Sequence, residues 1–245
     1  MVGIVSDIGN YRLVNEDAVG YFEDTNLRYY IVADGMGGHN AGEVASNIAV
    51  NHTINFIKEA SLKNPIEYKD ILKKAIEMAN THIYLLSKEK ESYCGMGTTV
   101  TACLINNNKI YIANVGDSSC IVIKSDSNIE KITKDHSLVQ ELIDSGSITI
   151  EQALRHPNKN IITRALGTNE KVRIDIYEFD NIGFSKIILC SDGLTNGVSL
   201  EEILTIVTKY NSEVASKKLV ELSKENGSKD NISVIVFEGA DKNDR

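Results

Sequence analysis

Three aspartates each come at the end of an apolar run that is typical of a buried β-strand, and each has a glycine beside it. They are Asp34, Asp117 and Asp192, which end the segments 29–34, 110–117 and 186–192. Taken alone, each Asp-Gly or Gly-Asp pair indicates only a turn. Three carboxylates delivered by three separate strands favour a shared site instead.

If these strand ends meet in the fold, their negative charges must be compensated. Two carboxylates about 4 Å apart repel each other by roughly 4 kcal/mol at an effective dielectric constant of 20. Either the pair shares a proton, or a cation lies between its members. Ligation by oxygen alone selects Mg²⁺, Mn²⁺ or Ca²⁺ over zinc and copper. We therefore expect a metal centre built from carboxylates.

The segment 11–17 adds a cation and two further carboxylates to the candidate residues. Glu16 and Asp17 are adjacent, so on an extended chain they point to opposite faces, and only one of them can face a site directly. Arg12 carries a guanidinium, the side chain best shaped to bind a phosphate with two hydrogen bonds. The alternative for Arg12 is an ordinary solvated position on the surface.

The composition limits the classes of partner. The 245 residues suffice for one large domain or two small ones. A net charge of −8 argues against nucleic acid and against an anionic membrane surface as partners. No apolar run is long enough to span a membrane, and the residues after Met1 do not resemble a signal peptide. We therefore expect a cytoplasmic protein with no membrane association.

Several other classes of enzyme are disfavoured by missing motifs. None of the four cysteines is followed six positions later by arginine, so the nucleophile of a cysteine-based phosphatase is absent. The cysteines also form no C-x-x-C pair, and reduced, buried thiols are the expectation for the three that lie in apolar, strand-like runs. Asn40 stands where a dinucleotide-binding G-x-G-x-x-G needs its last glycine, and no P-loop sequence is present.

Hydrophobic periodicity predicts strands, then two helices, then strands, helices and a last strand. Because the helices are grouped and the strands include hairpins, the sheets should be largely antiparallel. We expect an α+β fold in which two sheets pack face to face, with helices on the outside. Residues 1–240 should form a single domain, followed by a polar tail at 241–245. The strands are expected at 2–7, 18–22, 29–34, 98–105, 109–115, 119–124, 129–132, 172–180, 186–190 and 232–237.

Two stretches carry more detailed expectations. A helix is expected from an N-cap at Asn64 to about Lys90. Its inner face should comprise Ile71, Ala75, Met78, His82 and Leu85. The segment 145–168 is expected to be irregular, because it contains Pro157 and separates two regular regions. A loop of this length in a compact domain is typical of a functional element, and we interpret it as a mobile flap.

These residues lie in motifs that resemble those of the metal-dependent serine/threonine protein phosphatases of the PP2C (PPM) type, in particular their compact bacterial form. The motifs occur in the family's order and span nearly the whole chain. The resemblance implies a four-layer α-β-β-α sandwich with a metal cluster at one end of the central sheets. The matching pieces are Ser6-Asp7-x-Gly9-x-x-Arg12-x-x-Asn15-Glu16-Asp17, Val32-Ala33-Asp34-Gly35-Met36-Gly37-Gly38-His39, Gly97-Thr98-Thr99, Gly116-Asp117-Ser118, Asp135-His136-Ser137, Ile162-Thr163-Arg164-Ala165-Leu166-Gly167, Ser191-Asp192-Gly193-Leu194 and Asp230-Asn231.

The resemblance also implies a set of metal ligands. Asp34, Asp192 and Asp230 would hold one Mn²⁺ or Mg²⁺ ion. Asp34 would bridge to a second ion, held also by the Gly35 carbonyl and by Asp17, with Glu16 as the alternative to Asp17. Relatives with a third ion use the positions of Asp117 and Asp192. Two or three ions per chain are therefore expected.

The same resemblance implies a protein phosphatase that hydrolyses phosphoserine and phosphothreonine. A hydroxide bridging two ions would attack phosphorus, and Arg12 would bind the phosphate. His39 is the nearest candidate in sequence for a general acid, and His136 is as compatible with a structural role. Ser119 departs from the arginine that many relatives have after Gly-Asp-Ser.

The partners implied are phosphoproteins modified by a bacterial serine/threonine kinase, and a monomer is expected. The alternative is a non-catalytic pseudophosphatase on the same fold. Such a protein would be expected to have lost metal-binding aspartates, and none of them is missing here.

Overall fold

The chain folds into two antiparallel β-sheets that pack face to face. The computed structural model describes residues 1–37, 41–62, 67–106 and 109–239. The five-stranded sheet has the order β1, β11, β10, β7, β8, and the six-stranded sheet has the path β2, β3, β5, β6, β9, with β4 paired to the end of β3. The strands are β1 Val2–Asp7, β2 Asp17–Glu23, β3 Leu27–Met36, β4 Gly97–Thr98, β5 Val100–Asn106, β6 Lys109–Val115, β7 Ser119–Lys124, β8 Ile129–Lys131, β9 Asp175–Asp180, β10 Phe184–Cys190 and β11 Ile232–Glu238.

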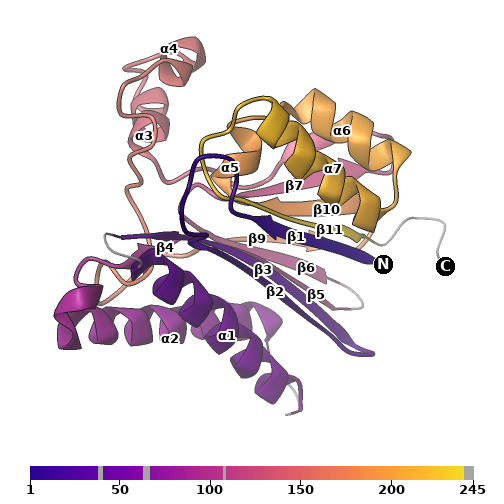
Figure 1. Cartoon of the computed structure of the whole chain (residues 1–245). Helices are drawn as coiled ribbons and strands as arrows, with labels where there is room; N and C mark the ends of the chain where they lie inside the picture. The colour runs from indigo at the N-terminus through magenta and orange to yellow at the C-terminus, as the bar shows by residue number, and fades with distance from the viewer. Residues whose placement is uncertain (38–40, 63–66, 107–108, 240–245) are drawn as a thin grey trace.

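Helices cover the outer face of each sheet (Figure 1). The long helices α1 (Ala41–Ser61) and α2 (Tyr68–Glu89) pack on the six-stranded sheet, and α6 (Leu200–Lys209) and α7 (Ser212–Glu225) pack on the five-stranded sheet together with the short α5 (Asp192–Thr195). A single 3₁₀ turn at Glu91–Tyr93 follows α2. This is the predicted α-β-β-α sandwich, and the predicted fold class is confirmed.

The hydrophobic core has three layers because side chains alternate along each strand. On β3, Tyr29, Ile31 and Ala33 face the helices α1 and α2. Tyr30 and Val32 face the opposite sheet, where Tyr30 stacks on Phe237 of β11. The third layer lies between the five-stranded sheet and the helices α6 and α7. Among the described residues, no helix combines the length and apolar composition that a membrane span requires.

The predicted inner face of α2 is wrong at three positions. Ile71 and Ala75 are buried, but Met78, His82 and Leu85 are exposed. The buried stripe continues instead through positions 72, 76, 79, 80, 83 and 87. His82 contacts His52 of α1 at the surface, where the two ring nitrogens are 2.6 Å apart. The predicted N-cap Asn64 and the polar tail 241–245 lie outside the described residues.

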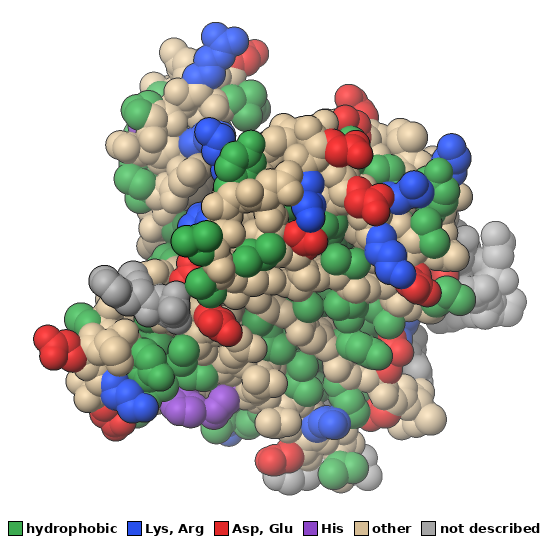
Figure 2. Space-filling view, in the orientation of Figure 1, with side chains coloured by type: hydrophobic (Ala, Val, Ile, Leu, Met, Phe, Trp, Pro, Cys, Tyr) green, Lys and Arg blue, Asp and Glu red, His purple; other side chains and the backbone are tan. Residues whose placement is uncertain are grey.

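The segment 145–168 is more regular than predicted. Its last residues pack in the main body, where Leu166 is fully buried and exchanges two backbone hydrogen bonds with Thr98 of β4. Its first part forms, together with α3 (Leu138–Asp144), a lobe that stands apart from the main body (Figures 1 and 2). It contains a second helix, α4 (Ile150–Leu154), which begins with a complete capping box between Thr149 and Gln152. The expectation of an irregular segment is therefore corrected here. Its mobility remains a prediction.

Candidate active site

Five aspartates come from the ends of strands in both sheets. Asp17 begins β2, where it pairs in register with Asp34 of β3. Asp117 follows β6, Asp192 follows β10 and opens α5, and Asp230 lies two positions before the start of β11. The charges of Asp17, Asp117, Asp192 and Asp230 all act on the carboxyl group of Asp34. The strand ends therefore converge, as the sequence predicts.

The electrostatics of this group of aspartates, called here the carboxylate cluster, are unfavourable to full ionisation. Burial raises the pKa of Asp34 well above its ordinary value, and the other four carboxylates raise it further. Burial is also the largest cause for Asp17 and Asp117, each with a pKa of about 7, and for Asp192, with a pKa of about 6. The carboxylate of Asp192 adds to the shift in both Asp17 and Asp117.

Several oxygens of the cluster have no partner. Asp17 Oδ1, Asp117 Oδ1 and Asp192 Oδ1 are buried and accept no hydrogen bond from any described residue. Leaving a buried acceptor unpaired costs about 1–3 kcal/mol, and more when the group is charged. A bound cation would satisfy all three oxygens, and an all-oxygen donor set fits Mg²⁺ or Mn²⁺. The residues present therefore fit a divalent metal ion.

Two other carboxylate oxygens of the cluster are held by neighbouring polar groups. Ser191 Oγ donates to Asp17 Oδ2 at 2.7 Å, and Asn196 Nδ2 donates to Asp192 Oδ2 at 2.9 Å. With the side chains in these positions, no three His, Cys, Asp or Glu residues in the described ranges form a complete ligand group around one point.

Arg12 provides positive charge at the cluster. Its Nη2 donates to Asp230 Oδ2 at 2.8 Å. This hydrogen bond raises the pKa of Arg12, and the charges of Asp230, Glu16 and Asp34 add to the effect. Both partners are partly exposed, so the pair adds little to stability. The guanidinium thus lies where it can meet a phosphate that approaches the cluster.

The loop that carries Arg12 is joined at both ends by one side chain. Asn231 Nδ2 donates to the carbonyls of Ile8 and Val14, each at 3.0 Å, and Asn231 Oδ1 accepts from the Glu16 amide at 2.9 Å. Gly9, within this loop, has φ +75° and packs against the main chain of Asp230. A Cβ at this position would be 2.3 Å from the Asp230 carbonyl oxygen. Only glycine fits this position.

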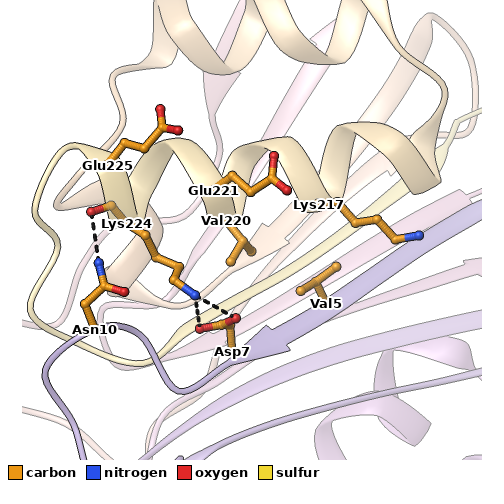
Figure 3. Close-up of a pocket in the computed structure, with 8 residues that line it drawn as sticks. All are labelled: Val5, Asp7, Asn10, Lys217, Val220, Glu221, Lys224 and Glu225. Carbon is orange, nitrogen blue, oxygen red and sulfur yellow. Dashed lines mark hydrogen bonds and ion pairs between the residues drawn. The ribbon is translucent and has the colours of Figure 1, made fainter.

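The outer side of the same loop packs beside α7 (Figure 3). Asn10 Nδ2 donates to the Lys224 carbonyl at 3.3 Å, and Lys224 Nζ lies 3.0 Å from Asp7 Oδ1. These residues line a hollow of about 510 Å³ whose apolar part includes Val5 and Val220. The hollow is separate from the carboxylate cluster.

Glu16 and Gly35 lie at the start of α1. The Gly35 amide donates to the Glu16 carbonyl at 3.1 Å, and the Gly42 amide donates to the Glu16 carboxylate. A Cβ on Gly42 would lie 2.4 Å from Glu16 Oε1, so the approach of helix and carboxylate requires glycine. Burial raises the pKa of Glu16. Glu16 therefore lies beside the carboxylate cluster, and Asp17, which belongs to the cluster, is the more buried of the two.

His136 connects the turn that carries Asp117 to the segment 145–168. The Gly116 amide donates to His136 Nδ1 at 3.0 Å, and the His136 amide donates to the Gly116 carbonyl at 2.9 Å. Since Nδ1 accepts, Nε2 carries the proton and donates to Asp175 Oδ2 at 3.1 Å. Arg164 Nη1 lies 2.8 Å from Nε2, but its hydrogen bond goes to Asp175 Oδ1 at 2.9 Å. Burial lowers the pKa of His136, which agrees with a neutral ring.

Not every candidate residue can be placed, and some contributors had no predicted role. His39 lies outside the described residues. No role was predicted for Ser191, Asn231 or Asp175. Ser191 and Asn231 nevertheless lie next to candidate metal ligands in the motifs that match the phosphatase family. That adjacency was the available signal for those two. Ser119, which departs from the common family pattern, is fully buried at the start of β7.

Comparison with known proteins places this chain in a family. The protein phosphatase 2C family model matches residues 10–226. A serine/threonine phosphatase from Listeria monocytogenes is 41% identical over 240 residues, which cover 95% of this chain and 93% of the relative.

Solved structures agree with the sequence comparisons. The serine/threonine phosphatase Stp1 from Staphylococcus aureus has a TM-score of 0.87 at 38% identity, covering 98% of this chain and 94% of that one. The catalytic domain of the phosphatase PstP, in complex with two manganese ions, has a TM-score of 0.85 at 31% identity and covers 98% of both chains. The chain therefore belongs to the protein phosphatase 2C family and is an enzyme, a serine/threonine phosphatase of that type.

Proposed function

We propose that this phosphatase works by metal-assisted hydrolysis with Mn²⁺ or Mg²⁺ at the carboxylate cluster. The observation that carries the proposal is the set of three buried, unpartnered carboxylate oxygens, which come from both sheets. The proposed ligands are Asp17, Asp34, the Gly35 carbonyl, Asp117, Asp192 and Asp230, with Glu16 as the alternative to Asp17. Two or three ions would be held by this set.

When bound, the ions supply an activated water near neutral pH and neutralise charge on the phosphoryl oxygens. The chain's own residues would hold the ions and bind the substrate phosphate. The carboxylates would position the ions, and their mutual repulsion in the cluster is relieved when a divalent cation takes the place of bound protons. Arg12 exchanges part of its contact with Asp230 for the substrate phosphate, where a guanidinium forms two parallel hydrogen bonds.

A general acid should protonate the seryl or threonyl oxygen that leaves. The proposed general acid is His39, because it lies close to Asp34 in the sequence. His136 is a weaker candidate, because both of its ring nitrogens are engaged by Gly116 and Asp175. Its contacts favour a structural role.

The substrates are proposed to be phosphoproteins of a bacterial serine/threonine kinase, dephosphorylated in the cytoplasm by a monomeric enzyme. The names of the bacterial relatives support the substrate class. The four cysteines are free thiols in the structure, which supports a reducing compartment.

The test is turnover of a phosphothreonine peptide with Mn²⁺, with and without a chelator, by wild type and Asp192→Asn. Because Asn keeps the shape of the ligand but lacks its charge, we expect a loss of at least about 10³-fold in kcat/KM. Circular dichroism checks that the variant is folded. Turnover that survives saturating chelator would contradict the metal mechanism. A folded wild type that binds the peptide without hydrolysing it would favour the pseudophosphatase.

A further inference from the structure

We propose that the loop 8–14, called here the specificity loop, selects substrates that carry an apolar side chain next to the phosphoserine or phosphothreonine. The proposal rests on the proposed role of Arg12 as the phosphate-binding residue. It names the class of phosphorylated segment that this enzyme prefers, a property that the metal chemistry alone leaves open.

The specificity loop exposes three large apolar side chains. Leu13 is 95% exposed and is the most exposed large hydrophobic side chain of the described residues. Tyr11 is 61% exposed and Ile8 is 40% exposed. Hydrophobic side chains also lie at the surface in Figure 2 where Figure 1 draws this loop between β1 and β2. Single exposed apolar residues are common, but three within six positions indicate a contact surface.

The backbone of this loop is fixed before any substrate arrives. Asn231 joins its two ends through the carbonyls of Ile8 and Val14, and Asn10 joins its middle to α7. Gly9 lies against the Asp230 main chain without space for a side chain. A surface presented by a fixed loop loses little conformational entropy when it binds, so its contacts add more to affinity.

The apolar side chains lie within reach of the residues beside the phosphate. Tyr11 and Leu13 flank Arg12 in the chain, so their Cα atoms are about 3.8 Å from that of Arg12. A phosphoserine or phosphothreonine bound at the Arg12 guanidinium would bring its own neighbours to the surface that this loop exposes. The chemistry of these neighbours then meets Leu13 and Tyr11, which favour apolar partners because burial removes their surfaces from water.

The exposed leucine contributes little to the stability of the fold. With 95% of its surface in solvent, Leu13 loses almost no contact with water on folding. Replacing Leu13 should therefore leave the melting temperature unaffected. Any change in substrate preference can then be assigned to the loss of the exposed side chain. Leu62, which is 87% exposed at the end of α1, offers a chemically matched control outside the specificity loop.

The experiment compares two phosphothreonine peptides that differ only at the positions flanking the phosphothreonine, Leu in one and Ser in the other. For the wild type we expect kcat/KM for the Leu peptide to exceed that for the Ser peptide by about tenfold. Leu13→Ser should reduce this ratio to near one, and Leu62→Ser should leave it at the wild-type value. Each rate is normalised to the same variant's turnover of p-nitrophenyl phosphate, which has no flanking residues.

The outcomes separate this inference from the proposed function. A wild type that turns over neither p-nitrophenyl phosphate nor either peptide would overturn the proposed function. Turnover of p-nitrophenyl phosphate with equal rates on the two peptides would overturn the specificity loop alone. A ratio that persists in Leu13→Ser and in Tyr11→Ser would do the same. So would a dimer in sedimentation analysis that Leu13→Ser dissociates, since it would assign the loop to self-association.

Discussion

At the scale of single residues, Arg12 has two competing uses. It pairs with Asp230 in the structure, and its guanidinium is the proposed ligand of the substrate phosphate. We predict that Arg12→Ala raises KM for a phosphopeptide by about 10- to 100-fold with a smaller effect on kcat, because a hydrogen bond to a charged group contributes about 1.5–3 kcal/mol. Arg12→Lys should give an intermediate KM, since lysine keeps the charge but lacks the planar fork.

Steady-state kinetics at saturating Mn²⁺ test this prediction. An unchanged KM together with a large fall in kcat would contradict a role in phosphate binding. Thermal unfolding is the control, and we expect both variants to lie within about 1 kcal/mol of the wild type because the ion pair with Asp230 is partly exposed.

Sequence reasoning worked best for residues at which chain geometry and chemistry coincide. Asp34, Asp117 and Asp192 follow apolar strands and could be identified from that pattern alone. Asp230 came from the family resemblance, because nothing in its local pattern distinguishes it from a turn residue. Asn231 could not be recognised as the residue that joins the ends of the loop 8–14, since its three hydrogen bonds connect segments more than 200 positions apart.

At the scale of elements, the turn after β6 depends on the segment between β8 and α3. His136 exchanges two hydrogen bonds with Gly116, next to Asp117, and its ring also contacts Asp175. We predict that His136→Ala lowers the free energy of unfolding by about 2–3 kcal/mol, because the buried Gly116 amide loses its acceptor. The concentration of Mn²⁺ that gives half-maximal activity should rise, since Asp117 loses its fixed position.

Urea denaturation and Mn²⁺ titration measure the two effects of His136→Ala. His82→Ala is the matched control, because His82 is exposed on α2, and we expect it to change stability by less than about 0.5 kcal/mol. A His136→Ala enzyme with normal stability and normal Mn²⁺ dependence would contradict this account of the turn.

The errors at this scale have specific physical causes. The predicted and observed inner faces of α2 share Ile71 and Ala75 and then diverge, because both i+3 and i+4 steps are compatible with a period of 3.6 residues. Two exposed apolar residues, Met78 and Leu85, favoured the wrong steps. Helix α4 was missed although Thr149-x-x-Gln152 is a capping box, because the five-residue helix that follows is too short to show periodicity.

At the scale of the whole molecule, the carboxylate cluster contributes to the dependence of stability on pH. Asp17, Asp34, Asp117 and Asp192 have raised pKa values, so the folded chain binds more protons than the unfolded chain between about pH 4 and pH 7. In the presence of a chelator, this contribution to the free energy of unfolding is therefore lost as pH rises through that window. Mn²⁺ competes with the protons and should weaken or reverse the decline.

Thermal unfolding at about pH 5 and about pH 7.5, with chelator or with Mn²⁺, tests this prediction. Mn²⁺ at about 100 times its Kd should raise the melting temperature by about 5–11 °C at the higher pH. The shift should be smaller in Asp192→Asn, which serves as the control. With chelator, a wild type whose melting temperature changes with pH across the window in the same way as that of Asp192→Asn would contradict the pKa directions.

The strand order has a consequence for the synthesis of this enzyme on the ribosome. β11 lies between β1 and β10, so the first strand of the chain finds its partner only when residues 232–238 have left the exit tunnel. Asp230 and Asn231 emerge just ahead of that strand. Asp230 supplies the carboxylate that pairs with Arg12, and Asn231 supplies the side chain that joins the ends of the loop 8–14. If Asp230 and Arg12 have the roles proposed above, we expect a nascent chain to remove no phosphate from neighbouring proteins until this segment is released.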